Sequence, residues 1–222
     1  MDLPVYELSS VLKDPAITIP LYFPLSNKFN ALVKRTFDIV ISILIVLLVL
    51  SWLLPVLALI IWIDSSGPIF FLQRRTKSLG QEFTCIKLRT MLVNTEADIL
   101  SATENDYRIT KVGKLLRKYH IDELPQFMNV LAGDMSVIGP RPHMIIETSR
   151  YECLLTEYSG RHAIKPGITG LAQSFGHFGA TEDLDKMKYR VYLDLKYIRE
   201  WSLIMDITIL LRTCALILGM PI

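Results

Sequence analysis

The stretch from residue 39 to residue 63 constrains this 222-residue chain most, because it is an apolar run without a single charged side chain. As a helix, roughly 25 residues rising about 1.5 Å each reach roughly 37 Å, whereas the hydrocarbon core of a bilayer is about 30 Å thick. The run is too long for the apolar part of a signal peptide, and no small-residue cleavage site follows it. The segment is therefore predicted to lie in a membrane.

The path of this segment through the membrane stays open. Basic residues flank both ends, Lys34 and Arg35 before the run and Arg74 and Arg75 after it, so the positive-inside rule gives no orientation. Pro55 lies within the run, where it removes a backbone donor and favours a kink. The residues allow a kinked spanning helix, which the length favours, or a re-entrant segment that breaks at Pro55 and returns to the same side.

Charge and cysteine content narrow the class of protein. The 24 basic and 22 acidic residues give a net charge of +2 and are interspersed, which argues against a nucleic-acid partner. Cys85, Cys153 and Cys214 are far apart in the sequence, so neither a disulfide framework nor a zinc site is predicted. A reducing compartment that faces the cytosol fits best.

The rest of the chain is expected to be arranged around the apolar run. Residues 1–33 carry prolines without helical periodicity and predict an irregular lead-in, residues 34–64 the membrane anchor, and residues 65–222 one compact domain. In that domain, alternation at 69–72 and 81–89 predicts a β-hairpin. The predicted class is α+β and mostly helical.

Three later segments have helical character, namely 111–119, 184–201 and 203–218. The last is mostly apolar but is interrupted by Asp206 and Arg212, which disfavours a second membrane span. It predicts either an amphipathic helix at the membrane interface or a core helix of the domain.

Cations gather around the predicted hairpin: Arg74, Arg75, Lys77, Lys87 and Arg89. Such side chains bind anionic membrane lipids or substrate phosphates, and both roles remain open. Arg141 lies between Pro140 and Pro142, which restrict the backbone, and a guanidinium held in this way is suited to bind a phosphate. A structural ion pair is the alternative for Arg141.

Two adjacent acids, Asp122 and Glu123, open a short apolar stretch that ends at Gly133. Asp122 is a good helix N-cap, Pro125 is tolerated in a first turn, and Gly133 suits a C-cap, so ordinary capping explains the pattern. The alternative is chemical. An ionised carboxylate can attack phosphorus while its neighbour holds Mg²⁺, and a helix N-terminus beside Arg117 favours ionised acids and attracts phosphate.

From about residue 34 to the C-terminus the chain resembles the bacterial sugar transferase family, the monotopic phosphoglycosyl transferases. The motifs that carry the resemblance occur in order: Lys34-Arg-Thr-Phe-Asp38, Ser66-Gly-Pro68, Lys87-Leu-Arg-Thr-Met91, Asp122-Glu-Leu-Pro-Gln126, Gly133-Asp-Met-Ser136, Gly139-Pro-Arg-Pro142 and Lys165-Pro-Gly-Ile-Thr-Gly-Leu-Ala-Gln173. Several are weak singly, but the ordered set is specific.

The resemblance implies a re-entrant helix-break-helix anchor, broken at Pro55, that holds the catalytic domain on the cytoplasmic face of the bacterial inner membrane. It also implies transfer of a sugar 1-phosphate from a nucleotide diphosphate sugar, with UDP the expected nucleotide, to a polyprenyl (undecaprenyl) phosphate in a ping-pong reaction that uses Mg²⁺. A homodimer is left open.

The resemblance also assigns residues. Asp122 matches the nucleophile and Glu123 the Mg²⁺ ligand. Phosphate binding is expected of Lys87, Arg89, Arg117 and Arg141, and active-site support of Asp194, Gln173 and His177.

The chain departs from the family pattern at two places. The break is Leu54-Pro55 where the family commonly has Ser-Pro, so a hydroxyl that would bond freed backbone is missing. After Gln173 the chain lacks an arginine that the family usually carries, and His177 is the candidate substitute. The kink geometry and the recognition of nucleotide or sugar are expected to differ accordingly.

Two other functions compete with the transferase. A membrane-bound phosphohydrolase would use the same acid pair with water in place of the lipid acceptor. A catalytically idle scaffold for glycan assembly is a different class, and the intact pair of Asp122 and Glu123 argues against it because a scaffold has no need for it.

Overall fold

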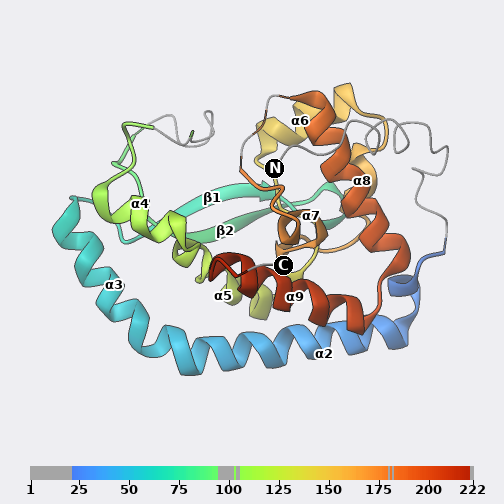
Figure 1. The fold of residues 1–222 in the computed structure, drawn as a ribbon, viewed down its shortest axis with the longest axis horizontal. Coiled ribbons are helices and arrows are strands. Elements are labelled where there is room, and N and C mark those ends of the chain that lie inside the picture. Colours follow the sequence, from blue (N-terminus) through green and yellow to red (C-terminus); the bar gives the residue numbers. More distant parts are fainter. Residues whose placement is uncertain (1–21, 95–102, 104–105, 180, 182, 221–222) are drawn as a thin grey trace.

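The computed structural model describes residues 22–94, 103, 106–179, 181 and 183–220, so the first 21 residues of the irregular lead-in expected at 1–33 lie outside the described part. The rest of that lead-in is not irregular throughout, because Pro24–Ser26 and the residues from Lys28 onward are helical. In chain order the elements are η1 (Pro24–Ser26), α2 (Lys28–Ile45), η2 (Val46–Leu50), α3 (Ser51–Asp64), β1 (Phe70–Thr76), η3 (Ser78–Gly80), β2 (Glu82–Leu88), α4 (Lys111–Lys118), η4 (Ile121–Glu123), α5 (Gln126–Ala132), β3 (Ser136–Ile138), α6 (Ile145–Leu154), η5 (Tyr158–Ala163), β4 (Gly167–Thr169), α7 (Leu171–Ser174), α8 (Leu184–Glu200) and α9 (Leu203–Ile217). Helices dominate and the described strands form two small sheets (Figure 1), which confirms the mostly helical α+β class.

The described strands form two short, two-stranded sheets. Strands β1 and β2 pair antiparallel from Phe70 opposite Leu88 to Thr76 opposite Glu82, which confirms the predicted hairpin. Strands β3 and β4 pair in parallel, with Ser136 opposite Gly167. The second sheet was not predicted, because three-residue strands carry too little alternation to be recognised.

One helix, Lys28–Asp64, is long and apolar enough to cross a membrane by length and composition. It runs through α2, η2 and α3, and Figure 1 shows it bending between α2 and α3. It begins at Lys28, before the predicted start of the anchor at residue 34, because the Asn27 side chain caps it by accepting from the backbone N–H of Phe29 at 2.8 Å.

The long helix is interrupted by a π-helical turn, η2, and α3 continues without a break through Pro55. In η2 the backbone N–H of Ser51 donates to the carbonyl of Val46, five residues back. Pro55 lies inside α3 and has no N–H to donate. The side chains at the break bond to nearby backbone: the Ser51 hydroxyl donates to the carbonyl of Leu47 at 2.6 Å, and the Trp52 indole to that of Leu48 at 2.8 Å. Ser51 thus supplies a hydroxyl that Leu54-Pro55 lacks.

The α2 part of this helix carries a polar stripe that faces the protein. Lys34, Asp38 and Ser42 follow one another at four-residue spacing and are all buried. Apolar side chains elsewhere on the same long helix are exposed, among them Val40, Leu44, Leu47, Leu48 and Trp52. The helix therefore buries its polar face in the domain and presents an apolar surface outward, the reverse of a helix on a water-soluble protein.

Lys34 joins this stripe to the last helix. Its ammonium lies 2.9 Å from an Asp206 carboxylate oxygen on α9 and 3.4 Å from one of Asp38. Asp206 also accepts from the hydroxyl of Tyr197 at 2.7 Å and from the indole of Trp201 at 3.2 Å. The acid predicted to interrupt an apolar helix is therefore buried within the domain and fixes α9 to α2.

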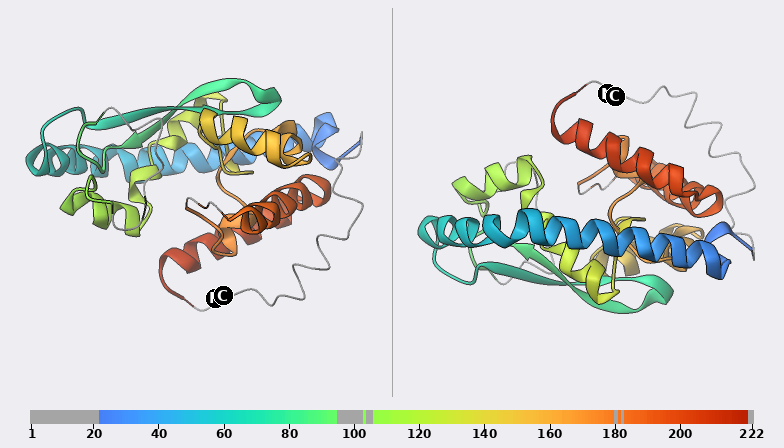
Figure 2. Two further views of the ribbon diagram at one scale, coloured as in Figure 1. Left: turned by 90° about the horizontal axis from the view of Figure 1, so that it is seen from above. Right: turned by 90° about the horizontal axis from the view of Figure 1, so that it is seen from below.

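Asp38 joins the same stripe to the second sheet. One carboxylate oxygen accepts from the Ser136 hydroxyl and from the Val137 backbone N–H, both at 2.9 Å. Strand β3 is thus held directly against α2. Figure 2 shows the long helix lying across one face of the domain, with the hairpin on one side of it and α8 and α9 on the other.

The far end of α3 is attached to the same domain. Leu57 and Ile61 pack with Leu88 of β2 and Leu116 of α4. The guanidinium of Arg89 donates to the carbonyl of Ser65 at 2.6 Å, to that of Ser66, and to that of Ile61 at 3.4 Å. Charged donors suit the unpaired carbonyls at a helix C-terminus. Both ends of the apolar helix therefore contact one domain.

Replacing Lys34 with Met tests this attachment. The variant is expected to unfold more readily by about 3–5 kcal/mol, because two carboxylates then stay buried without their shared cation. Thermal unfolding in a detergent micelle measures the change. Lys28→Met makes the same substitution at an exposed position of α2 and should change stability by less than about 0.5 kcal/mol. Equal unfolding temperatures for Lys34→Met and the unmodified chain would contradict the attachment.

Candidate active site

The acid pair lies in the short turn η4, between α4 and α5. The predicted N-cap role of Asp122 is wrong: α5 begins at Gln126, and its N-cap position is Pro125. Pro125 has no N–H for the carbonyl of Ile121, which instead accepts from Leu124 at 3.2 Å, and such i to i−3 bonding makes a 3₁₀ turn. The acids therefore precede the helix by one turn.

Helix α5 is fixed in place at its middle and at its C-terminal end. The Asn129 side chain pairs with the backbone of β2, accepting from Ile86 at 3.0 Å and donating to Thr84 at 2.8 Å. The predicted C-cap Gly133 is confirmed, with φ of 93° in the left-handed region that glycine tolerates. Beyond it, the guanidinium of Arg35 donates to the carbonyls of Val130 and Leu131 at 2.6 and 3.0 Å. The membrane anchor thus holds the helix that carries the acid pair.

Glu123 is clamped by two cations. Its Oε1 lies 2.6 Å from the Lys87 ammonium and 2.6 Å from an Arg141 guanidinium nitrogen, and its Oε2 accepts a second bond from Arg141 at 3.1 Å. Burial raises the pKa of this carboxyl, but the charges of Arg141 and Lys87 outweigh burial and hold the pKa well below its usual range. Glu123 is therefore ionised and immobilised, and its charge raises the pKa of Arg141 in turn.

Asp122 is held differently. It is buried, yet within the described parts of the chain its carboxylate makes no hydrogen bond and no ion pair. Burial raises its pKa and the charge of Glu123 raises it further, whereas Lys87 and Arg117 act to lower it. Of the two adjacent carboxylates, one is clamped, and the other has no bonding partner within the described residues, so its oxygens are available to a substrate.

Arg117 comes to this site from α4. Its Nε donates to the hydroxyl of Thr90 at 2.8 Å, which orients the guanidinium. The structure thus brings together Lys87, Arg117 and Arg141 around Asp122 and Glu123, as the sequence predicted for phosphate binding.

Arg141 is positioned by a second arginine behind it. Arg161 donates to the backbone carbonyl of Arg141 at 2.9 Å and is paired with Asp194 at 2.7 Å. The same guanidinium lies 2.8 Å from the ring nitrogen of His143 and 3.2 Å from the hydroxyl of Tyr158. Asp194, which was expected to support the site, is therefore connected to Arg141 through Arg161. Sequence reasoning missed Arg161, because no local pattern separates it from a surface arginine. His143, which lies beside it, is buried.

Other predicted site residues are placed elsewhere. Arg89 is not joined to the acid pair, because its guanidinium is bound to the carbonyls at the end of α3. Gln173 is buried, and neither polar atom of its amide has a partner within the described residues. His177 lies edge-on to Tyr189 with ring centroids 5.1 Å apart. Pro55, the expected break of the apolar segment, lies inside α3, and the π-helical turn η2 precedes it.

The acid pair is compatible with the expected magnesium. Among the described residues no group of three or more His, Cys, Asp or Glu side chains is gathered as for a metal. Mg²⁺ is commonly bound by only one or two carboxylates, together with substrate phosphates and water. Asp122 is unbonded and the Oε2 atom of Glu123 makes a single contact, at 3.1 Å, so two carboxylates retain oxygen lone pairs for such an ion.

The match to a known protein family covers nearly the whole of the described chain. Residues 29–220 match the family described as "Bacterial sugar transferase". The UDP-glucose:undecaprenyl-phosphate glucose-1-phosphate transferase of Escherichia coli (strain K12) is 46% identical over 196 residues, which cover 88% of this chain and 42% of that protein. This chain thus spans about two fifths of that relative.

Two shorter relatives are covered more completely. The transferase of the same name from Caulobacter vibrioides is 43% identical over 191 residues, 86% of this chain and 71% of that protein. The "Exopolysaccharide production protein PSS" of Rhizobium leguminosarum bv. phaseoli is 42% identical over 189 residues, 83% of this chain and 94% of that protein. With its motifs, its acid pair and a match over nearly its whole described length, the chain belongs to the bacterial sugar transferase family.

Proposed function

We propose that this chain transfers a sugar 1-phosphate from a nucleotide diphosphate sugar to polyprenyl phosphate, with release of a nucleoside monophosphate. The observation that carries the proposal is the acid pair, in which Glu123 is clamped by two cations while Asp122 is unbonded beside them. Relatives from two organisms are named for UDP-glucose and undecaprenyl phosphate, so UDP-glucose is the first donor to test.

In the first half-reaction Asp122 is the nucleophile. A carboxylate oxygen forms a bond to the phosphorus that carries the sugar, the bond from this phosphorus to the bridging oxygen breaks, and the nucleoside monophosphate leaves with that oxygen. Lys87 and Arg117, whose charges act on Asp122, are suited to bind the phosphate oxygens. The product on the enzyme is a phosphosugar ester of Asp122.

In the second half-reaction an oxygen of polyprenyl phosphate attacks the same phosphorus. The bond to Asp122 breaks, the carboxylate is restored, and the product is a polyprenyl diphosphate sugar. Asp122 and Glu123 would hold Mg²⁺, which when bound neutralises charge on the phosphates. The chain would then perform the first membrane step in the synthesis of an exopolysaccharide, capsule or other glycan.

We further propose that residues 28–64 enter and leave the membrane on one side, which we take to be the cytoplasmic face of the bacterial inner membrane. Support comes from both ends of this helix, which contact the same domain through Lys34 and Arg35 at one end and through Arg89 at the other. A helix that crossed the bilayer would carry its far end away from that domain. The exposed apolar residues Ile204, Ile207 and Leu211 on α9 support an interfacial position for that helix.

Asp122→Asn tests the proposed function. The substitution keeps size and removes the nucleophile, so release of nucleoside monophosphate should fall more than about a thousandfold. The assay supplies UDP-glucose and undecaprenyl phosphate to the purified chain and separates the nucleotide, lipid-linked and free sugar products. Asp185→Asn, at an exposed carboxylate of α8, is the matched control. Full activity of Asp122→Asn would refute the mechanism, and free sugar phosphate in place of lipid-linked sugar would identify a phosphohydrolase.

Arg89→Gln and Arg141→Gln separate helix capping from phosphate binding. Arg89→Gln should cost about 1–3 kcal/mol of stability, because carbonyls at the end of α3 lose a charged donor, and should leave the KM for UDP-glucose unchanged. Arg141→Gln should lower kcat/KM at least about tenfold. Unfolding temperatures and initial rates measure both. A raised donor KM in Arg89→Gln at unchanged stability would favour the phosphate role that the sequence predicted for it.

Asp194→Asn tests whether this acid acts through Arg141. The variant leaves Arg161 without its buried counter-ion, so the unfolding temperature and kcat/KM should both fall. Combined with Arg141→Gln, it should reduce kcat/KM little further, because both changes disable one guanidinium. Fully additive losses in the double variant would show that Asp194 contacts the reaction directly.

A further inference from the structure

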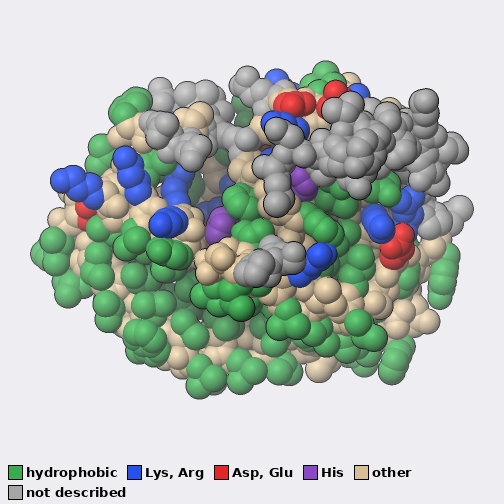
Figure 3. All heavy atoms as spheres, in the orientation of Figure 1, with side chains coloured by type: hydrophobic (Ala, Val, Ile, Leu, Met, Phe, Trp, Pro, Cys, Tyr) green, Lys and Arg blue, Asp and Glu red, His purple; other side chains and the backbone are tan. Residues whose placement is uncertain are grey.

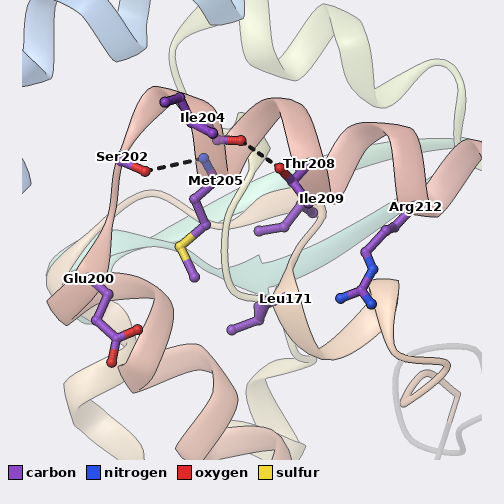
Figure 4. Close-up of a pocket in the computed structure, with 8 residues that line it drawn as sticks. All are labelled: Leu171, Glu200, Ser202, Ile204, Met205, Thr208, Ile209 and Arg212. Carbon is purple, nitrogen blue, oxygen red and sulfur yellow. Dashed lines mark hydrogen bonds between the residues drawn. The ribbon is translucent and has the colours of Figure 1, made fainter. Parts of the chain in front are cut away.

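A groove lies between α7, α9 and the end of α8, outside the set of residues around the acid pair (Figure 4). Its volume is about 360 Å³, within the range of roughly 300–1,000 Å³ that is typical of ligand sites. Leu171, Met205 and Ile209 supply apolar walls, and Arg212 lies at one end with Glu200 near the other. The groove thus suits a ligand that is apolar along its length and anionic at one end.

Arg212 is held at the groove without a neutralising acid. Its guanidinium lies 4.4 Å from the ring centroid of Phe175, which fixes its position by a cation–π contact. Within the described residues it takes part in no salt bridge. A positioned cation at the end of an apolar groove is available to bind a phosphate.

One short loop joins the Arg212 end of the groove to the residue that precedes the acid pair by two positions. Phe175 begins a short loop in which Phe178 packs edge-on against His120, with ring centroids 5.3 Å apart. His120 precedes Asp122 by two residues in the chain. One loop therefore contacts Arg212 at one end and the approach to Asp122 at the other.

The groove also adjoins apolar surface. Ile204, which lines it, is 77% exposed, and Leu211 on the same helix is 65% exposed. Figure 3 shows hydrophobic side chains gathered over the lower part of this face, where Figure 1 draws α2, α3 and α9. A long apolar chain would reach the groove from the bilayer without passing through water.

We infer that this groove binds the isoprenoid chain of the polyprenyl phosphate acceptor, with Arg212 drawing its phosphate toward Asp122. The inference rests on the proposed function and assigns residues to its second substrate. A polyprenyl phosphate has one anionic group on one long apolar chain, which matches a groove with one unneutralised cation.

Two groove variants of the full chain test the inference. Arg212→Gln removes the cation, and Met205→Trp fills the groove. Each should raise the KM for undecaprenyl phosphate about tenfold or more and leave the KM for UDP-glucose unchanged. Without acceptor, the enzyme should release one nucleoside monophosphate per Asp122 in the first half-reaction. The amount and rate of this release should be the same in both variants as in the unmodified chain. Arg212→Lys, which keeps the charge, should recover part of the acceptor affinity.

Control variants and separate measurements distinguish loss of acceptor binding from loss of membrane binding and from failure of the proposed function. Lys186→Gln at an exposed site of α8 and Leu154→Trp at an exposed site of α6 should leave the acceptor KM unchanged. An unchanged acceptor KM in both groove variants overturns the inference. So does a loss of binding to phospholipid vesicles at unchanged acceptor KM, which would assign the groove to bilayer lipid. If the unmodified chain forms no lipid-linked sugar, the proposed function itself fails.

Discussion

The buried ammonium of Lys34 is the interaction on which the rest of the structure depends. It lies between Asp38 and Asp206 and so joins the membrane helix to α9. Asp38 in turn holds Ser136 and Val137 of β3, the strand that leads to Arg141. The neighbouring Arg35 holds the end of α5, whose first turn follows the acid pair. The two halves of the site, the acids and the arginine that clamps one of them, are therefore both positioned by a single turn of the membrane helix.

Within the site, the neighbouring cations bind Glu123 and leave Asp122 without an ion pair in the described residues, although both side chains are carboxylates. Three cations, Lys87, Arg117 and Arg141, face two carboxylates, so a net positive charge remains to attract a phosphate. Glu123 takes both of its ion pairs from this set, and its low pKa follows from them. The oxygens of Asp122 have no bonding partner within the part of the chain that the structure describes. The Arg161–Asp194 pair behind Arg141 is neutral overall, so it orients the guanidinium without altering this balance.

Local patterns predicted the parts of this structure that depend on local forces. The hairpin, the helices α4, α8 and α9, and the glycine cap at Gly133 follow from periodicity and backbone preference, and the structure has all of them. The failures involve partners distant in sequence or competing local rules. Pro125 forces a 3₁₀ turn where capping by Asp122 was predicted. Arg89 finds carbonyls more than twenty positions earlier, and Asp194 meets Arg161 across 33 positions, which no motif reveals. The acid pair and Arg141 were recognisable because their motifs occur in order.

Because of its polar stripe, the apolar helix cannot be surrounded by lipid on all sides. Lys34, Asp38 and Ser42 could not rest in hydrocarbon without a large cost in free energy, so α2 requires the domain as the partner for that face. The Ser51 hydroxyl and the Trp52 indole bond carbonyls where the helix bends, which makes the break tolerable in lipid. Because Asp206 binds Lys34, helix α9 is fixed to the anchor, and the groove beside Arg212 is fixed with it. Membrane depth, the acid pair and the inferred acceptor groove are thus set by one rigid connection, so displacing the anchor would disturb all three together.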